Sequence, residues 1–131
     1  MRKTPLKKTS KQPISKLQRK LWELCKQIIR KRYPPVCYTC GRPVSGSNDH
    51  TSHMIPKAAC GAYLKYDLRN LRRTCYNCNI NLGGNGAEFY RKMMVEIGAT
   101  AMNELLEDRK VTVKAQDHYL KLIEEYKQIL T

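Results

Sequence analysis

The sequence contains Cys37-Tyr38-Thr39-Cys40 and, further along, Cys75-Tyr76-Asn77-Cys78-Asn79, and these two C-x2-C pairs decide the fold. Each pair can offer two thiolates to one ion, which is what a closed tetrahedral zinc site requires. We therefore predict a structural zinc ion held by Cys37, Cys40, Cys75 and Cys78. The insert between the pairs, residues 41–74, is longer than a minimal zinc ribbon needs. It carries His50 and His53, which suggests that the metal holds a functional site in place.

The charge of the chain is concentrated near its N-terminus. The 131 residues carry a formal net charge of +14 and suggest one small domain with an arm. Residues 1–35 contain many Lys and Arg but only one acid, Glu23, whereas residues 36–131 are nearly balanced. Such a distribution indicates a polyanionic partner, and DNA fits best. The alternative is a solvated basic tail that keeps the protein soluble.

Membrane and secreted proteins are poorly matched by this sequence. No apolar run approaches the roughly 20 residues needed to span a bilayer, and the arm has no apolar face to insert into a membrane surface. The start, Met1-Arg2-Lys3, is not followed by the apolar segment of a secretory signal. We expect an intracellular protein, in which C-x2-C pairs bind metal rather than form disulfides.

The pattern along the chain predicts an α+β fold. Apolar spacing predicts a basic amphipathic helix that Ser15 and Gln18 open as a capping box and that Pro34-Pro35 ends. Further helices are expected at 87–97, 99–108 and 115–130, with Gly98 as a break. A short strand is expected within 49–55, a helix starting at Cys78, and irregular structure over 56–66. The predicted divisions are a flexible basic arm at 1–13, a helix at 14–35, a zinc-bound core at 36–86 and a helical part at 87–131.

The insert and the second Cys pair together resemble a nuclease motif. His53 lies in His53-Met54-Ile55-Pro56, Asn70 follows, and Asn79 comes nine residues after Asn70, directly beside Cys78. This order is similar to the HNH, or ββα-metal, nuclease motif in its H-N-N form. The resemblance implies a β-hairpin and a helix around one catalytic divalent cation, on a treble-clef zinc scaffold.

A closer resemblance covers about residues 37–108. The matching elements are C-x2-C-G-R-P, L-K-Y-D-x-R-N, C-x2-C-N, G-G-N and a following Y-R helix. They resemble the NinG/Rap family of phage recombination endonucleases. The resemblance implies cleavage of branched DNA, such as Holliday-junction intermediates, in the cytoplasm of a bacterial host.

The residue types suit phosphodiester hydrolysis. His53 can take a proton from water near neutral pH. Asn79, fixed beside a zinc ligand, can offer its amide oxygen to Mg²⁺ or Mn²⁺, and Asn70 is expected to orient the hairpin loop and so fix His53. Many HNH enzymes have Asp or His just before the base, but here that position is Ser52. His50 and Asp49 are both candidates for the missing ligand, and the sequence does not decide whether His50, Asp49 or Ser52 completes the metal site.

Several basic residues are candidate DNA contacts. They are Lys7, Lys8, Lys16, Arg19, Lys20, Arg30, Lys57, Arg69, Arg72 and Arg73. The last three could instead form a solvated face, and His118 is expected to be structural or exposed. Two other functions remain open: a non-catalytic zinc module that binds DNA, and a general HNH nickase without branch preference. The apolar stripes at 14–29 and 115–130 could form a homodimer interface or be buried within one chain.

Overall fold

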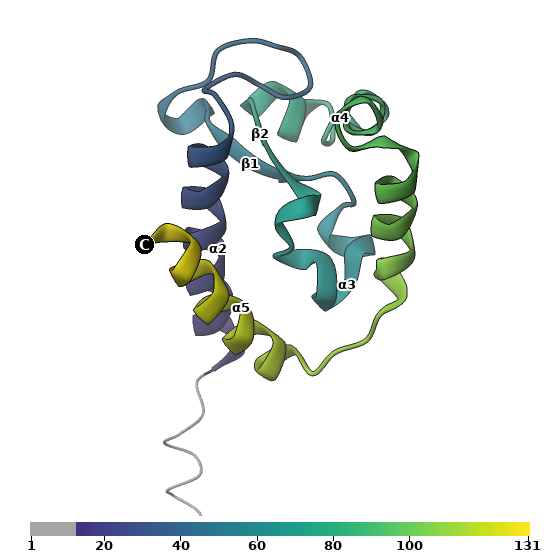
Figure 1. Ribbon diagram of the computed structural model, residues 1–131. Coiled ribbons are helices and arrows are strands. Elements are labelled where there is room, and N and C mark those ends of the chain that lie inside the picture. The colour runs from purple at the N-terminus through teal and green to yellow at the C-terminus, as the bar shows by residue number, and fades with distance from the viewer. Residues whose placement is uncertain (1–12) are drawn as a thin grey trace, which may run out of the picture.

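A two-stranded antiparallel sheet lies between the helices of the molecule (Figure 1). In the computed structural model, which describes residues 13–131, strand β1 spans His50–His53 and strand β2 spans Leu71–Thr74. Their register pairs His50 with Thr74 and His53 with Leu71. The predicted arm, with Lys7 and Lys8, lies outside the described residues apart from Pro13.

Helix α2, Ile14–Arg32, forms because apolar residues recur every three or four positions along it. The buried positions are Leu17, Leu21, Leu24, Cys25, Ile28 and Ile29. The predicted capping box is wrong. The helix begins one residue before Ser15, directly after Pro13, and no side chain caps it, because Pro at this point already fixes the backbone that enters the first turn. The helix ends at Arg32, before the two prolines.

Helix α5, Ala115–Leu130, packs along α2 at the side of the sheet opposite α4 (Figure 1). Its Tyr119, Ile123 and Tyr126 join the buried residues of α2 in one apolar cluster with Tyr66 and Leu71. The two apolar stripes that the sequence left open as a dimer interface are therefore largely buried against each other within one chain.

Helix α4, Gly86–Glu107, bends at Gly98, whose φ of 84° and ψ of 168° are not helical. The prediction of two helices separated by this glycine is confirmed. Both halves contribute to a second apolar cluster, Phe89 and Met93 from the first half and Met102 and Leu105 from the second. A left-handed φ of this kind favours glycine, because other residues pay a steric penalty there.

The segment predicted to be irregular contains helix α3, Lys57–Lys65. Gly61, with φ of 72°, interrupts it, so that each half is about one turn long and gives no periodic pattern in the sequence. Short turns complete the chain: η1 Gly46–Asn48, η2 Leu68–Asn70, η3 Asn77–Asn81 and η4 Asp108–Lys110. The helix expected from Cys78 is the single π-helical turn η3.

The α+β class with flanking helices is confirmed. The two apolar clusters lie on either side of the insert that connects the Cys pairs, and the thiols form a third, small cluster with Val44. Among residues 13–131 no helix is both long and apolar enough to cross a membrane.

Candidate metal centre and active site

Four thiol groups meet where the chain leaves α2 and β2. The Sγ atoms of Cys37, Cys40, Cys75 and Cys78 all lie within 4.8 Å of one another. Cys40 Sγ and Cys75 Sγ are 3.8 Å apart. Four sulfurs placed about 2.3 Å from a tetrahedral zinc ion stand about 3.8 Å from each other. The cluster therefore fits a structural zinc ion, which these four side chains would enclose.

Hydrogen bonds prepare the thiols for a metal. The backbone N–H groups of Cys40 and Cys78 donate to Cys37 Sγ and Cys75 Sγ at 3.5 and 3.4 Å. Burial raises the pKa of the Cys37 thiol, but hydrogen bonds from the Thr39 hydroxyl and from nearby backbone N–H groups lower it, to about 6. A thiolate is the form that binds zinc, so this environment favours metal binding at Cys37, whereas burial raises the pKa of the Cys40 thiol to about 12.

Asn79 and His50 lie together beside the thiol cluster. Asn79 Nδ2 is 2.8 Å from His50 Nδ1, and His50 Nε2 is 3.1 Å from the carbonyl oxygen of Ser47. Because the carbonyl can only accept, His50 carries its proton on Nε2, and its Nδ1 accepts the hydrogen bond that Asn79 Nδ2 donates. The ring of Tyr76 packs edge-on against His50, with centroids 5.6 Å apart. Within residues 13–131, Asn79 Oδ1 has no hydrogen-bond partner, so it is the atom of this pair that is available to a cation, and His50 orients the amide that carries it.

The other two candidates for the missing ligand are already engaged. Asp49 accepts hydrogen bonds from Arg73 Nε and Nη2, both at 2.8 Å, through its two carboxylate oxygens. The Ser52 hydroxyl is hydrogen-bonded to the Thr74 hydroxyl across the sheet. Of the three positions left open by the sequence, His50 is the one that contacts Asn79.

His53 lies in a different environment, at the end of β1. Its Nε2 is 2.7 Å from the carbonyl oxygen of Lys65, and its ring stacks on Trp22 with centroids 5.4 Å apart and an interplanar angle of 4°. Since the carbonyl accepts, the proton is on Nε2 and Nδ1 is unprotonated. Burial lowers the pKa of His53 to about 4, and the charges of Lys57 and Lys65 add to the lowering, although the hydrogen bond to Lys65 opposes it.

Asn70 holds the loop that follows His53. Its Oδ1 accepts from the Ile55 backbone N–H at 2.8 Å, and its Nδ2 donates to the Ile55 carbonyl at 3.1 Å. The Asn70 backbone carbonyl also accepts from the N–H of Met54. The side chain is fully buried. These are the loop contacts that the sequence led us to expect, while the contribution of Asn70 to catalysis stays a prediction.

The strand separates the two histidines. Side chains alternate between the faces of a strand, so His50 and His53, three residues apart, point to opposite faces. One contacts Asn79 and the other contacts Trp22 of α2. The residues expected to form one constellation are thus divided between a site at His50 and Asn79 and a pocket at His53.

Comparison with known proteins now identifies the family. The model of the bacteriophage lambda NinG protein family matches residues 1–131. The chain belongs to the NinG family. It is 30% identical over 110 residues to the NinG protein of Salmonella phage P22, which is 82% of this chain and 53% of that relative. The chain therefore spans about half the length of this curated relative. No solved structure matches the chain.

Two of the arginines assigned to DNA are structural in this NinG-family chain. Arg72 is 3% exposed, and its guanidinium lies over the rings of Tyr33 and Tyr38 and donates from Nε to Glu96 at 3.1 Å. Because this guanidinium is buried and already paired, the structure does not favour Arg72 as a phosphate contact. Arg73 is likewise committed to Asp49, as described above.

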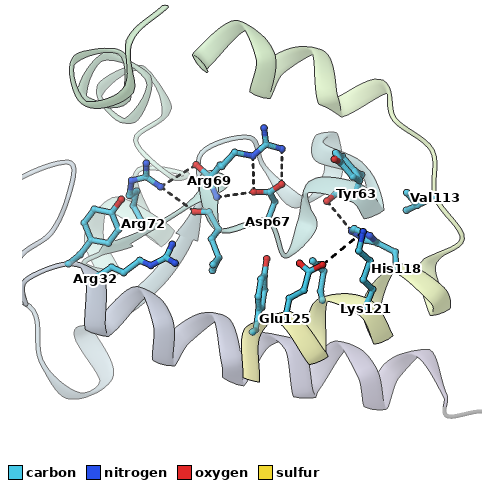
Figure 2. A pocket seen from close by; sticks show the side chains of 13 residues that line it. Arg32, Tyr63, Asp67, Arg69, Arg72, Val113, His118, Lys121 and Glu125 are labelled. Atoms are coloured by element: carbon cyan, nitrogen blue, oxygen red, sulfur yellow. Dashed lines mark hydrogen bonds and ion pairs between the residues drawn. The ribbon is translucent and has the colours of Figure 1, made fainter. Parts of the chain in front are cut away.

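Arg69 is more exposed but also neutralised. Its Nη2 donates to Asp67 at 2.7 Å and to Asp108 at 3.0 Å. Figure 2 shows Arg69 turned onto Asp67 at one side of a cavity of about 580 Å³ between α2, η2 and α5. In the same view His118 reaches the Tyr63 carbonyl, at 3.3 Å, which agrees with the structural role expected for it. Among the described residues, the assigned cations that are exposed and form no ion pair are Lys16, Arg19, Lys20 and Lys57, whereas Arg30 is exposed but pairs with Asp49 at 3.5 Å.

Sequence reasoning missed three functional neighbours in this NinG-family chain. Trp22 was not singled out, although it occupies the predicted helix and is the one tryptophan of the sequence. The backbone carbonyl of Lys65 orients His53, and a backbone contact of this kind cannot be predicted from the pattern of side chains. Tyr76, beside Cys75, was not assigned a role, and it is 49% exposed and contacts His50.

The lowered pKa of His53 predicts a pH-dependent stability. Between pH 6.5 and 4 the unfolded chain binds a proton at His53 that the folded chain does not, so stability falls as the pH falls through this range. The difference corresponds to at most about 3 kcal/mol. Urea denaturation should show that the free energy of unfolding decreases less between pH 7 and pH 5 in His53→Gln than in the wild type. Protonation of the metal-binding thiolates lowers the stability of both proteins in this range, and His118→Gln should show the same decrease as the wild type.

Proposed function

We propose that this NinG-family chain is a divalent-metal-dependent endonuclease that hydrolyses phosphodiester bonds in branched DNA. The proposal includes an HNH-type ββα-metal core on a treble-clef zinc scaffold. The observation that supports it best is the state of His53, a neutral imidazole that Lys65 and Trp22 hold in place. Its Nδ1 is unprotonated, and the residue lines a pocket with basic walls. A general base needs this combination of fixed orientation and available lone pair.

Each residue has a role in the proposed reaction. His53 Nδ1 accepts a proton from the attacking water. Asn79 Oδ1 would bind the cation, His50 Nδ1 would orient the Asn79 amide by accepting from its Nδ2, and Asn70 would keep the loop after His53 in place through Ile55. A bound Mg²⁺ or Mn²⁺ ion supplies charge neutralisation at the phosphate and at the leaving oxygen. The preference for branched DNA is drawn from the family resemblance.

The second candidate function is a non-catalytic, zinc-stapled module that binds DNA. It is favoured by the placement of His53 and His50 on opposite faces of β1, and by the engagement of Asp49 with Arg73 and of Ser52 with Thr74. A nuclease with this geometry must bring one phosphate within reach of both faces at the end of the strand, whereas a binding module has no such requirement. A nickase without branch preference shares the geometry of the first candidate.

Cleavage of end-labelled DNA separates these functions. A four-way junction and a linear duplex of the same sequences are incubated with the zinc-loaded protein and Mg²⁺, Mn²⁺ or no added divalent ion. We expect metal-dependent cutting of the junction that falls about 10²- to 10⁴-fold in His53→Ala, measured at protein concentrations that saturate the DNA. His118→Ala is the matched control and should cut as the wild type does.

The other outcomes are equally informative. Equal cutting of both substrates retains the enzyme and removes the branch preference. Binding without cutting under either metal supports the zinc module. Cutting that survives in His53→Ala excludes His53 as the base.

A further inference from the structure

A cavity of about 380 Å³ opens in front of His53 between the first turns of α2 and the two ends of α3. Its walls include Arg19, Trp22, His53, Lys57, Lys65 and Tyr66, and none of its lining residues is acidic. Its volume lies in the range of about 300–1,000 Å³ that small ligands occupy.

The cations of this cavity are available to a ligand. Among the described residues, Arg19, Lys57 and Lys65 form no ion pair, and Lys65 Nζ lies only over the ring of Tyr66, 5.8 Å from its centroid. The cavity of Figure 2 differs, because Asp67 and Glu125 line it and Asp67 pairs with Arg69. Three unpaired positive charges with no carboxylate between them favour an anion of phosphate type.

Aromatic rings form the remaining wall. Trp22 is parallel to His53, and its ring meets Tyr66 edge-on with centroids 6.3 Å apart at 64°. Trp22 is only half-buried. An exposed aromatic surface beside a cluster of cations is the combination by which proteins bind single-stranded nucleic acid, since phosphates meet the cations and bases stack on the rings.

We propose that this pocket receives one unpaired nucleotide of the DNA strand, with its phosphate among Arg19, Lys57 and Lys65 and its base against Trp22. The proposal deepens the proposed function and rests on it for the identification of the ligand as DNA. The volume admits a single nucleotide, whereas a base pair within a stacked duplex does not fit. The site therefore selects strands that are already unpaired, as at a branch or a fork.

Trp22 reports occupancy of the pocket directly, because the chain has one tryptophan. Its fluorescence is followed while the zinc-loaded full chain is titrated with a single-stranded oligonucleotide, a forked duplex or a blunt duplex, without added Mg²⁺ or Mn²⁺. We expect quenching by the first two and binding of the blunt duplex with little quenching. Equal quenching by all three, or none at saturation with single strand, would overturn the proposal.

Variants test the two halves of the pocket separately. Fluorescence anisotropy of a labelled single strand should show a loss of affinity of about five- to 100-fold for Trp22→Leu, with most of the affinity kept by Trp22→Phe. Lys57→Gln and Lys65→Gln should each reduce the slope of log affinity against log salt concentration by about 1, which corresponds to the loss of one phosphate contact. Lys127 is an exposed lysine on α5, and Lys127→Gln should leave both the affinity for the single strand and its salt dependence unchanged. Equal effects of Lys57→Gln and Lys127→Gln would contradict the assignment.

These measurements are independent of cleavage. If unpaired strands quench the Trp22 fluorescence but the protein cuts no DNA, the nucleotide pocket is supported and the nuclease function is not. If the protein cuts duplex and branched DNA alike and Trp22 fluorescence does not change, the nuclease function is supported and the nucleotide pocket is not.

Discussion

Replacement of Cys78 by Ser is expected to abolish zinc binding and to unfold the segments that carry the two Cys pairs. The apolar cluster around the thiols consists of Cys37, Cys75, Cys78 and Val44, so little hydrophobic burial remains there without the ion. Zinc contributes on the order of 10 kcal/mol or more to the folding of comparable small sites. Because η3 is anchored by Cys78, its loss also releases Asn79 from His50.

Metal content and hydrogen exchange measure this effect. The wild type should retain one zinc ion per chain after gel filtration, and Cys78→Ser none, with fast exchange over residues 37–48 and 75–85. Cys60→Ala is the matched control, since Cys60 is buried but lies apart from the cluster, in the core of α3 and α4. Full zinc retention by Cys78→Ser would show that zinc is not held by the four-cysteine site.

Replacement of Arg72 by Met is expected to destabilise the protein by about 3–5 kcal/mol, toward the lower end because Glu96 is partly exposed. The Arg72 guanidinium donates to Glu96 and to three backbone carbonyl groups, with 2.7 Å to that of Leu71. Tyr33 and Tyr38 also donate their hydroxyl protons to Glu96, at 3.0 and 2.5 Å. Burial raises the pKa of Glu96, but the hydrogen bond from Tyr38 and the charge of Arg72 outweigh it and lower the pKa overall.

A surface pair provides the control for Arg72. Arg91 and Glu88 form an ion pair on the exposed side of α4, and exposed pairs add little to stability. Thermal or urea denaturation should therefore show a large shift for Arg72→Met and almost none for Arg91→Met. Similar small shifts for both would mean that the Arg72 network contributes little.

The local patterns predicted the parts of the fold that depend on local chemistry. The zinc cysteines followed from C-x2-C spacing, α5 from its apolar stripe and the bend in α4 from Gly98. Helix α3 was missed, because Gly61 divides it into turns too short for a periodic signal. The start of α2 was misplaced, because Ser15 matched a capping pattern that Pro13 made unnecessary.

The candidate site was predicted less completely, because the spacing of residues in a motif does not show which side chains are buried or which distant residues are in contact. A sequence shows that Arg72 is basic, but only the fold shows that Tyr33 and Tyr38 cover it. Likewise, the contact between Trp22 and His53 joins a helix to a strand that is distant in the chain. The separation of His50 from His53 was accessible from strand alternation, since three positions reverse the face.

The bend at Gly98 determines how far the molecule extends. A straight helix of the length of α4 would measure about 33 Å and would carry Met102 and Leu105 away from Phe89. Turning the corner at Gly98 folds this length back around α3, so that both halves close over the same apolar residues. The bend thereby separates the half of α4 that supplies Glu96 to Arg72 from the half that leads the chain back toward α2, against which α5 packs.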